Sequence, residues 1–346
     1  MKLIRTEDAV GCVLVHDLTQ IIRGVTKDAV FRKGHIVRPE DIPVLLSIGK
    51  EHLYVWENDE NMLHENDAAQ ILCKVCQNEG MHPSDVKEGK IELTAEFDGL
   101  FKVDGSRLQL VNGLGEMMIA TRHGNTPVKK GDKLAGTRII PLVIAKEKMQ
   151  HMREQCGDEP LLQLLPYVRK TAAIITTGSE VYHGRIQDTF TPVVEEKLAE
   201  YGIKAVYKTI LSDEHEKITA AILTAVRDKG VDMVLCTGGM SVDPDDRTPL
   251  AIKNTGAEIV TYGAPVLPGA MFLLAYYQRQ DGRIVPVMGL PGCVMYAKRT
   301  IFDLVLPRVA AADKIEASEL AALGQGGLCL NCSICTYPNC GFGKGW

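Results

Sequence analysis

The second half of the chain alternates short apolar runs with stretches whose apolar residues follow helical spacing. The apolar runs have the length and the Val, Ile and Leu content of buried strands, and helical stretches end before glycines. The predicted strands are residues 172–176, 204–211, 231–235, 258–262 and 283–288, and the predicted helices are residues 192–201, 214–229, a segment through Ile252, and 295–306. This alternation predicts an α/β domain with a largely parallel sheet and helices on both faces.

The first half of the chain lacks this rhythm and predicts a smaller, β-rich α+β domain. Helices are predicted at residues 39–49 and 66–76, and a strand is predicted at residues 52–56. Alternating apolar and polar residues on both sides of Asp104-Gly105 predict a hairpin that turns at this dipeptide.

A charged stretch at residues 146–160, which ends in Gly157 and Pro160, separates the two patterns and predicts a helical connector. We therefore expect four parts. They are the β-rich domain at 1–148, the helical connector at 149–168, the α/β domain at 169–314 and a cysteine-containing tail at 315–346.

Charge and length add exclusions to this picture. The chain has 346 residues, with 39 Lys and Arg against 44 Asp and Glu, and these charges are interspersed, which argues against a broad nucleic-acid-binding surface. No apolar run reaches the length of a membrane span, and charges interrupt the apolar residues at the N-terminus, unlike those of a secretory signal. We therefore expect a cytoplasmic protein that binds neither nucleic acid nor membrane.

Three strand-to-helix turns of the second domain are rich in glycine, hydroxyl and acidic side chains. They span residues 176–188, 237–246 and 290–292. In a parallel sheet such turns lie at one edge, where the strands end, and they can converge on one ligand. Glycine turns with hydroxyls and backbone amides suit a phosphate, whereas aspartates repel a phosphate unless a hard cation such as Mg²⁺ lies between them.

The same residues resemble the successive signatures of a known family. The signatures are Thr177-Gly178-Ser179-Glu180, Gly184 with Asp188, Gly238-Gly239 followed by Asp246-Arg247-Thr248-Pro249, and Gly289-Leu290-Pro291-Gly292. In order and spacing they look like the molybdopterin-binding domain shared by molybdopterin adenylyltransferases and molybdopterin molybdenumtransferases. The resemblance covers residues 169–312, and residues 34–55 resemble a segment of the molybdenumtransferases more weakly.

The resemblance implies that the domain binds molybdopterin or a molybdopterin nucleotide. It implies a transferase of molybdenum cofactor biosynthesis, acting by adenylyl transfer from ATP or by molybdate insertion, with Mg²⁺ as a candidate cofactor and a homo-oligomer as the assembly. Asp188 and Asp246 stand where the family keeps the aspartates of its pterin and nucleotide chemistry. The residues at its cofactor-binding positions are Thr177, Gly178, Ser179, Glu180, Gly238, Gly239, Ser241, Pro291 and Gly292.

Two other functions stay open. One is a non-catalytic carrier or sensor of the cofactor, whose cysteine tail recruits a molybdoenzyme or another redox partner. The other is a relative by fold alone that binds a different phosphorylated ligand. An ATP-dependent reaction distinguishes the transferase from the carrier, because the carrier binds and releases the pterin unchanged.

Several neighbours of these residues have simpler explanations. Asp243 and Asp245 suit a solvated turn or a helix N-cap, since Asp is favoured in both places. His183 and His215 lie near the turns, but lone histidines are more often structural or surface groups than ligand contacts. Ala270 stands where the family often carries a basic residue.

The tail contains a separate cysteine motif. Four thiolates in one short segment can hold an iron–sulfur cluster or a tetrahedral zinc ion, and the spacing is close to that of the cluster-binding run of bacterial ferredoxins. Disulfides are the alternative, disfavoured in a reducing compartment, where scattered cysteines are most simply small buried residues. The motif is C-x2-C-x2-C-x4-C, formed by Cys329, Cys332, Cys335 and Cys340.

Overall fold

The protein is described by a computed structural model that covers residues 2–22, 26–55, 60–241, 243–244 and 246–345. The chain divides into two compact units that interleave along the sequence. The first comprises Met1–Thr94, Val103–Arg122 and Lys133–Leu162, and the second comprises Ala95–Lys102, His123–Asp132 and Gln163–Trp346. The four-part division expected from the sequence stays a prediction.

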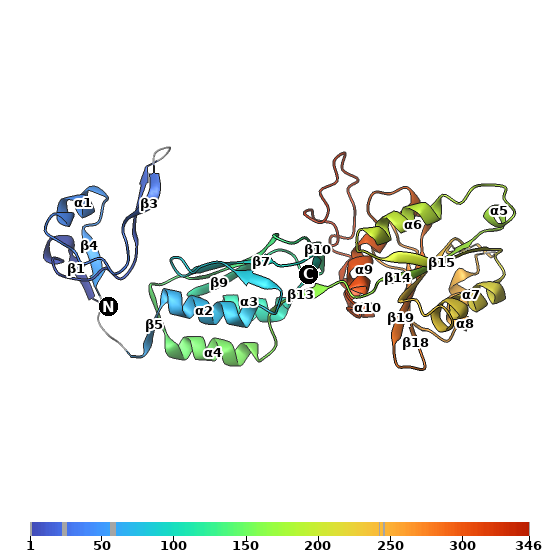
Figure 1. Ribbon diagram of the computed structural model, residues 1–346, viewed down its shortest axis with the longest axis horizontal. Coiled ribbons are helices and arrows are strands. Elements are labelled where there is room, and N and C mark those ends of the chain that lie inside the picture. The colour runs from blue at the N-terminus through green and yellow to red at the C-terminus, as the bar shows by residue number, and fades with distance from the viewer. Residues whose placement is uncertain (1, 23–25, 56–59, 242, 245, 346) are drawn as a thin grey trace. The chain divides into compact units, whose positions relative to one another are not determined.

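The first unit is β-rich, as its sequence predicts, and its strands form small antiparallel sheets (Figure 1). The pairs are β1 (Lys2–Arg5) with β4 (His52–Val55), β2 (Leu18–Ile22) with β3 (Thr26–Phe31), and β12 (Val143–Ala145) with β5 (Met62–His64). A four-stranded sheet has the order β6 (Met81–Pro83), β7 (Lys90–Ala95), β11 (Lys133–Ile139) and β9 (Met117–Thr121). The helices are α1 (Asp41–Ser47), α2 (Glu65–Cys76), α3 (Gly105–Gly113) and α4 (Lys146–Cys156), with a 3₁₀ turn at Thr6–Asp8.

The hairpin predicted around Asp104-Gly105 is wrong, because Asp104 caps helix α3. Its carboxylate accepts hydrogen bonds from the backbone amide of Arg107 at 2.9 Å and from the Nε of Arg107 at 2.8 Å. The Arg107 guanidinium also donates to the carbonyl oxygen of Cys156 at 2.8 Å. A side chain that satisfies a free helix amide stabilises the helix, and here this local bond outweighs the turn signal of the Asp-Gly pair.

The second unit is built on a six-stranded sheet, which confirms the predicted α/β fold. The strand order is β15 (Lys204–Leu211), β14 (Thr171–Thr177), β16 (Met233–Thr237), β19 (Ile284–Leu290), β18 (Leu273–Gln278) and β17 (Glu258–Tyr262). The first four strands are mutually parallel. Strand β18, which the sequence analysis missed, runs antiparallel to both β19 and β17, so β17 points the same way as β19. A further three-stranded sheet comprises β10 (Thr126–Val128), β8 (Gly99–Val103) and β13 (Leu162–Pro166).

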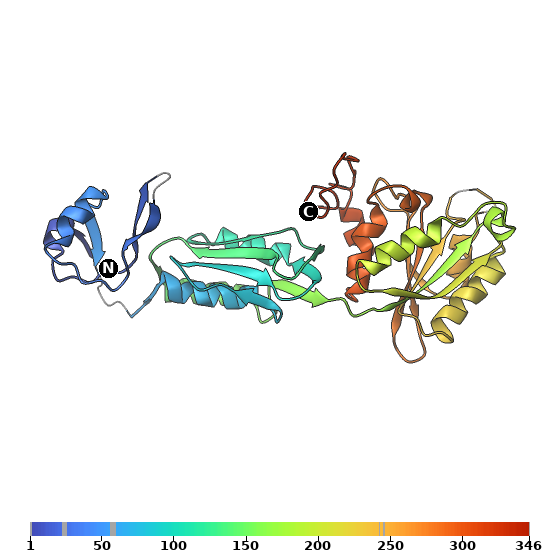
Figure 2. The same ribbon diagram turned by 45° about the horizontal axis from the view of Figure 1, so that its top comes forward.

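Helices cover both faces of the six-stranded sheet (Figure 2). Alternate residues of β14 point to opposite faces, so Ala172 and Ile174 join one apolar core while Ala173 and Ile175 join the other. The first core includes α6 (Phe190–Ala199), α9 (Ile301–Ala310) and α10 (Ala317–Ala322), and the second includes α7 (His215–Arg227) and α8 (Thr248–Asn254). A short helix, α5 (Ser179–Tyr182), follows β14 directly.

Helix α9 begins later than the sequence predicts. Residues Gly292–Met295 form a 3₁₀ turn instead of the first turn of the helix. The helix starts at Ile301 because Thr300 and Asp303 form a reciprocal capping box, in which the Asp303 carboxylate accepts from the Thr300 amide at 2.7 Å. Residues between the 3₁₀ turn and Thr300 are therefore irregular.

Asp303 also centres a buried charge network between α6 and α9. Its side chain is 2% exposed, and its Oδ1 accepts from the Nζ of Lys197 at 2.7 Å and from the Nη1 of Arg299 at 2.9 Å. Arg299 in turn contacts Glu200 at 3.2 Å. A buried carboxylate needs such partners, because it has lost its hydration.

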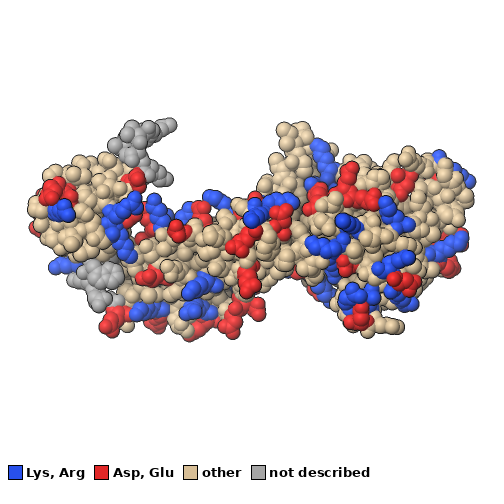
Figure 3. All heavy atoms as spheres, viewed as in Figure 1, with Lys and Arg blue, Asp and Glu red and all other residues tan. Residues whose placement is uncertain are grey.

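Within the residues described, no helix is long and apolar enough to cross a membrane. On the face shown in Figure 3, basic and acidic side chains are interspersed over the surface of each unit. This distribution agrees with the interspersed charges of the sequence and gives no broad basic surface on that face.

We expect Asp303→Ala to destabilise the second unit by about 3–5 kcal/mol, because it removes the helix cap and leaves Lys197 buried without its partner. The control is Asp281→Ala, which removes an exposed partner of Arg283 and should leave the stability nearly unchanged. Urea unfolding followed by circular dichroism, with hydrogen exchange of α9, measures both. Equal losses in the two variants contradict a structural role for the buried network.

Candidate functional site

The three turns selected from the sequence begin at the same edge of the six-stranded sheet. Strands β14, β16 and β19 are parallel neighbours, and they end within one residue of one another in register. Thr176 pairs with Thr237, and Thr237 pairs with Leu290. The turns that follow these strands therefore leave the sheet side by side, at the edge where open α/β sheets place ligands.

The first two turns touch at Gly238. This residue has a φ of 85°, and a Cβ atom built on it would lie 2.1 Å from the carbonyl oxygen of Thr177, so only glycine fits. Hydroxyl contacts join the same turns: the Thr237 hydroxyl donates to that of Thr176 at 3.2 Å, and the hydroxyls of Thr177 and Thr248 are 3.3 Å apart. The two turns thus form one continuous wall.

The second turn is held in shape by Asp246. Its carboxylate accepts a hydrogen bond from the backbone amide of Ser241 at 2.8 Å, and its own amide donates to the carbonyl oxygen of Asp243 at 2.9 Å. Gly239 has a φ of 57°, which again favours glycine. Asp245 lies outside the described residues. The amide of Ser241, a residue at one of the family's cofactor-binding positions, is therefore paired with a carboxylate.

Asp188 connects the end of the first turn to the sheet. Its carboxylate accepts from the backbone amides of Phe190 at 2.9 Å and Thr191 at 3.1 Å, at the start of α6. It also accepts from the hydroxyls of Thr191 at 2.5 Å and Thr176 at 3.4 Å. Asp188 is half-buried, so these bonds fix its position beside β14.

The third turn reaches the first through Met295. The hydroxyl of Thr189, next to Asp188, contacts the Met295 sulfur at 3.0 Å. Pro291 is buried, whereas Gly292 is exposed and nothing lies within 4 Å of a Cβ atom built on it. The third turn thus leaves open space at Gly292, beside the other two turns.

A fourth turn, missed by the sequence analysis, contributes Asp213. Its carboxylate accepts from the backbone amide of Ser179 at 2.9 Å and from the Ser179 hydroxyl at 3.0 Å. The neighbouring Gly178 is buried with a φ of 141°, and Glu180 is exposed. The available signal was an acidic residue two positions after the strand predicted at 204–211, because β15 is parallel to β14 and ends at the same edge.

Tyr262 was also missed. Its hydroxyl donates to the carbonyl oxygens of Met240 at 3.1 Å and Ser241 at 3.4 Å. These bonds place the phenol at the second turn. Burial raises the pKa of Tyr262, and the negative charge of Asp246 raises this pKa further. The sequence could not reveal this, because only the observed strand order brings the end of β17 to the ligand edge.

The two histidines near the turns differ in their contacts. His183 is exposed, and its Nδ1 is 2.7 Å from the carbonyl oxygen of Ser179. His215 begins α7, and its Nε2 lies 3.1 Å from a carboxylate oxygen of Glu216. The buried Nδ1 of His215 has no hydrogen-bond partner among the described residues.

Carboxylates dominate the chemistry of this edge. Asp188, Asp213 and Asp246 each already accept hydrogen bonds from neighbouring amides. In the described part of the chain, no three His, Cys, Asp or Glu side chains are arranged to hold a metal ion. A cation bound at this edge therefore needs oxygen ligands from the bound molecule as well, which is how Mg²⁺ commonly binds beside phosphates.

The structure does not gather the four tail cysteines. Cys329 and Cys340 are half-buried, whereas Cys332 and Cys335 are exposed, and residues 315–345 bring no three thiols within reach of one ion. Of the scattered cysteines, those buried as predicted are Cys73, Cys76, Cys156 and Cys236, whereas Cys12 and Cys293 are half-buried.

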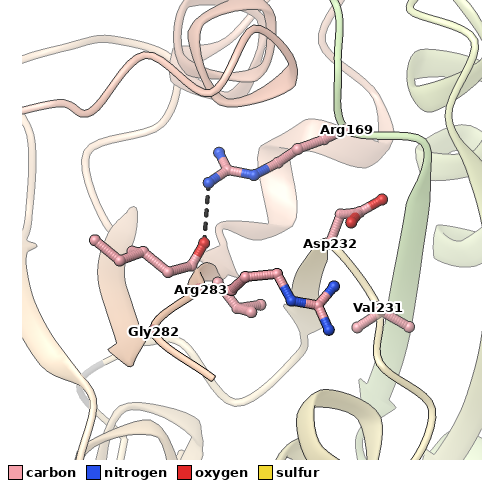
Figure 4. Close-up of a pocket in the computed structure, with 7 residues that line it drawn as sticks. Arg169, Val231, Asp232, Gly282 and Arg283 are labelled. Carbon is pink, nitrogen blue, oxygen red and sulfur yellow. Dashed lines mark hydrogen bonds between the residues drawn. The ribbon is translucent and has the colours of Figure 1, made fainter. Parts of the chain in front are cut away.

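A hollow of about 390 Å³ lies at the opposite edge of the sheet, where the strands begin (Figure 4). Arg169 and Asp232 line it, but their polar groups are engaged in the fold. The Arg169 guanidinium donates to the carbonyl oxygen of Ile284 at 3.0 Å, and the Asp232 carboxylate accepts from the Thr171 amide at 2.9 Å. The turns at the carboxyl edge, rather than this hollow, are the candidate site.

Comparison with known families assigns part of the second unit. Residues 173–311 match the family model described as "Probable molybdopterin binding domain", and residues 3–57 match a model described as a domain of unknown function (DUF8806). The chain therefore carries, in its second unit, a domain of the molybdopterin-binding family.

Similar proteins cover only part of the chain. Proteins named "Putative competence-damage inducible protein" from Bacillus cereus (strain Q1) and Bacillus anthracis are 32% identical over 112 residues, or 32% of this chain and 26% of each relative. The chain thus spans about a quarter of their length. The molybdopterin biosynthesis enzyme MoaB of Thermus thermophilus is 18% identical with a TM-score of 0.33, covering 42% of this chain and 98% of that one. The tungsten cofactor synthesizing protein MoaB of Pyrococcus furiosus is 22% identical with a TM-score of 0.32, covering 42% of this chain and 90% of that one.

The close contact at Gly238 gives a test of the site's architecture. We expect Gly238→Ala to destabilise the second unit by about 2–4 kcal/mol, because the new Cβ meets the Thr177 carbonyl and alanine disfavours the positive φ. Gly292→Ala is the comparison for stability, since its Cβ enters open space. Thermal unfolding with hydrogen exchange of β14 measures the difference. Similar melting temperatures for both variants contradict the tight apposition of the turns.

Proposed function

We propose that the molybdopterin-binding domain holds molybdopterin or a molybdopterin nucleotide at the carboxyl edge of its sheet, and that the protein takes part in molybdenum cofactor biosynthesis. The observation that carries this proposal is the direct contact of Gly238 with the Thr177 carbonyl, which joins the first two turns into one wall. The match of residues 173–311 to the family supplies the ligand class.

In this proposal the glycine-rich positions receive the phosphate of the pterin. Gly238 and Gly239 let the second turn pack closely against Thr177 and Thr248, and Ser241 adds an amide and a hydroxyl to that turn. The first turn contributes Thr177, Gly178, Ser179 and Glu180 to the proposed site, and the third turn contributes Pro291 and Gly292.

The hydrogen bond between Asp246 and the Ser241 amide supports an anion at this position. A carboxylate that accepts from a backbone amide occupies the place that a phosphate oxygen takes when an anion binds. An incoming phosphate then competes with Asp246 for the amide, and the two negative charges repel. A cation between them removes this repulsion.

Mg²⁺ fits the oxygen donors of this edge. It usually keeps several waters and binds through one or two carboxylates together with phosphates of the substrate. Asp188 and Asp246 are the carboxylates proposed for this role. Mg²⁺ supplies positive charge to the phosphate groups, while the residues of the turns bind and orient them.

The reaction we propose first is adenylyl transfer. An oxygen of the pterin phosphate attacks the α-phosphorus of ATP, a P–O–P bond forms, and the bond to the leaving diphosphate breaks. The protein contributes positioning and charge stabilisation, because phosphoryl-type transfers need little covalent chemistry from side chains. Insertion of molybdate into the bound pterin is the other reaction of this class.

One observation favours a carrier or sensor instead. The Asp188 carboxylate makes four hydrogen bonds to Phe190, Thr191 and Thr176, which account for it as a cap of α6 without any chemical step. A carrier uses the same wall to bind the cofactor but transfers no adenylyl group. A molybdoenzyme or another redox protein is then the partner that receives the cofactor.

Binding is tested by anaerobic calorimetry with molybdopterin. We expect Asp246→Ala to weaken binding roughly 10- to 100-fold in the presence of Mg²⁺, because the variant loses the carboxylate that faces the cation and orders the second turn. With EDTA the two proteins should differ much less. Asp281→Ala, at the opposite edge of the sheet, is the control and should bind as the unmodified protein does. No binding by the unmodified protein would refute the proposed ligand.

Catalysis is tested with ATP, Mg²⁺ and molybdopterin under the same conditions. A transferase forms adenylylated pterin and diphosphate, and Asp188→Asn should slow this reaction roughly 10²- to 10³-fold. Asn keeps an acceptor oxygen for the helix cap, so the fold should remain and only the charge is lost. Tight binding with no adenylylated product and no molybdate insertion supports the carrier instead.

A further inference from the structure

The cysteine tail forms a loop that is closed at its base. The backbone amide of Gly343 donates to the carbonyl oxygen of Gly326 at 3.0 Å, and the carbonyl oxygen of Gly341 lies 2.9 Å from a Cβ atom built on Gly326. All four tail cysteines lie between these two points. The closed base already restricts the conformations of this loop, which lowers the entropy cost of bringing the cysteines together.

Both ends of this loop are anchored in the second unit. At its start, the Cys329 amide donates to the carbonyl oxygen of Leu267 at 2.8 Å. At its end, the Tyr337 hydroxyl donates to the carbonyl oxygen of Asp303 at 2.8 Å. Cys329 and Cys340 both pack against the apolar core that contains α6 and α9. Cys329 and Cys340, the first and last cysteines of the motif, are thus both held against the same core.

The middle of the loop has no core of its own. Cys332 and Cys335 are exposed, and so are Leu330 and Ile334, each at 79%. A side chain from outside the loop holds this part: the Lys298 ammonium donates to the carbonyl oxygens of Cys332 at 3.0 Å and of the next residue at 2.9 Å. An exposed segment with apolar side chains and thiols at short intervals is what metal-dependent folds look like before the ligands close on the metal.

We propose that Cys329, Cys332, Cys335 and Cys340 hold one thiophilic metal centre, either an iron–sulfur cluster or a zinc ion. On binding, Cys332 and Cys335 move toward the two anchored thiols. The two alternatives share the same chemistry, in which four thiolates coordinate a soft metal. The site lies outside the pterin turns, and neither proposal depends on the other.

The surrounding charges fit such a centre. Four thiolates around a zinc ion or an iron–sulfur cluster carry a net negative charge, and the Lys298 ammonium is bound to the backbone of the loop. Arg299 stacks on the Tyr337 ring at 5.0 Å, at the other end of the loop. Lys298 is thus a positioning residue that holds the loop and offsets its charge.

The test uses the full chain, purified without oxygen. We expect either brown absorbance with iron and acid-labile sulfide or a colourless protein with one zinc per chain. Whichever metal centre is present should be lost in the double variant Cys332→Ser, Cys335→Ser. Cys12→Ser, a half-buried cysteine in the other unit, is the control and keeps the metal. The double variant should still bind molybdopterin, which separates failure of this site from failure of the pterin site.

The proposal is overturned if the protein neither contains these metals nor takes them up. The metal-free, reduced chain is titrated with Co²⁺, whose thiolate charge-transfer bands report coordination by sulfur, and is separately treated with iron and sulfide. No thiolate bands, no cluster and free reaction of all tail thiols with an alkylating reagent would exclude a metal centre. Tail thiols found in disulfides in the anaerobic protein would exclude it as well.

The role of Lys298 has its own readout. We expect Lys298→Gln to weaken Co²⁺ binding about tenfold, since partners outside the metal ligands commonly contribute this much. The thiolate bands should keep their shape, because the ligands are unchanged. Lys253→Gln, on α8, is the matched control. Equal Co²⁺ affinity in the two variants contradicts the positioning role.

Discussion

The backbone of the second turn passes the carbonyl oxygen of Thr177 so closely that Gly238 leaves no space for a Cβ atom. Two parallel strands end there in register, and the hydroxyls of Thr176 and Thr237 join them at 3.2 Å. The acidic residues of the edge depend on this contact, because it fixes the distance between the turn that carries Asp188 and the turn that carries Asp246. Without it, the edge has separate loops instead of one wall.

The aspartates of this edge serve the fold and the proposed chemistry together. Asp213 holds the Ser179 amide, and Asp246 holds the Ser241 amide. In the free protein these bonds order the turns, and the bond of Asp213 satisfies a half-buried donor. In the proposed complex the phosphate takes over an amide, and the carboxylate turns to Mg²⁺. Under the proposed function, one hydrogen bond therefore serves the fold of the free protein and lies at the place where the phosphate would bind.

The sequence predicts the sheet well because β14 and β16 are short, largely apolar runs of the kind that a buried parallel strand needs. The prediction from the sequence is wrong where the hydrogen bonds of a single side chain determine the local structure. The carboxylate of Asp104 caps a helix where the Asp-Gly pair suggested a turn, and no pattern of apolar residues records that bond. Asp213 and Tyr262 were missed because they reach the site only through the order of strands, with β15 and β17 at the two sides of the sheet. The family signatures named the turns, but the contacts between them are visible only in three dimensions.

The segment between Gly292 and Asp303 connects the two proposed sites. Gly292 borders open space in the third turn of the proposed pterin site, Lys298 binds the cysteine loop, and the carbonyl oxygen of Asp303 accepts from Tyr337 within that loop. The capping box at Thr300 makes this arrangement feasible, because it delays α9 and leaves the preceding residues irregular. In a helix that began at Met295, the side chain of Lys298 would follow the helix surface instead of reaching the loop. The position of one helix cap therefore determines that the cysteine loop and the edge proposed to bind phosphate share one stretch of chain.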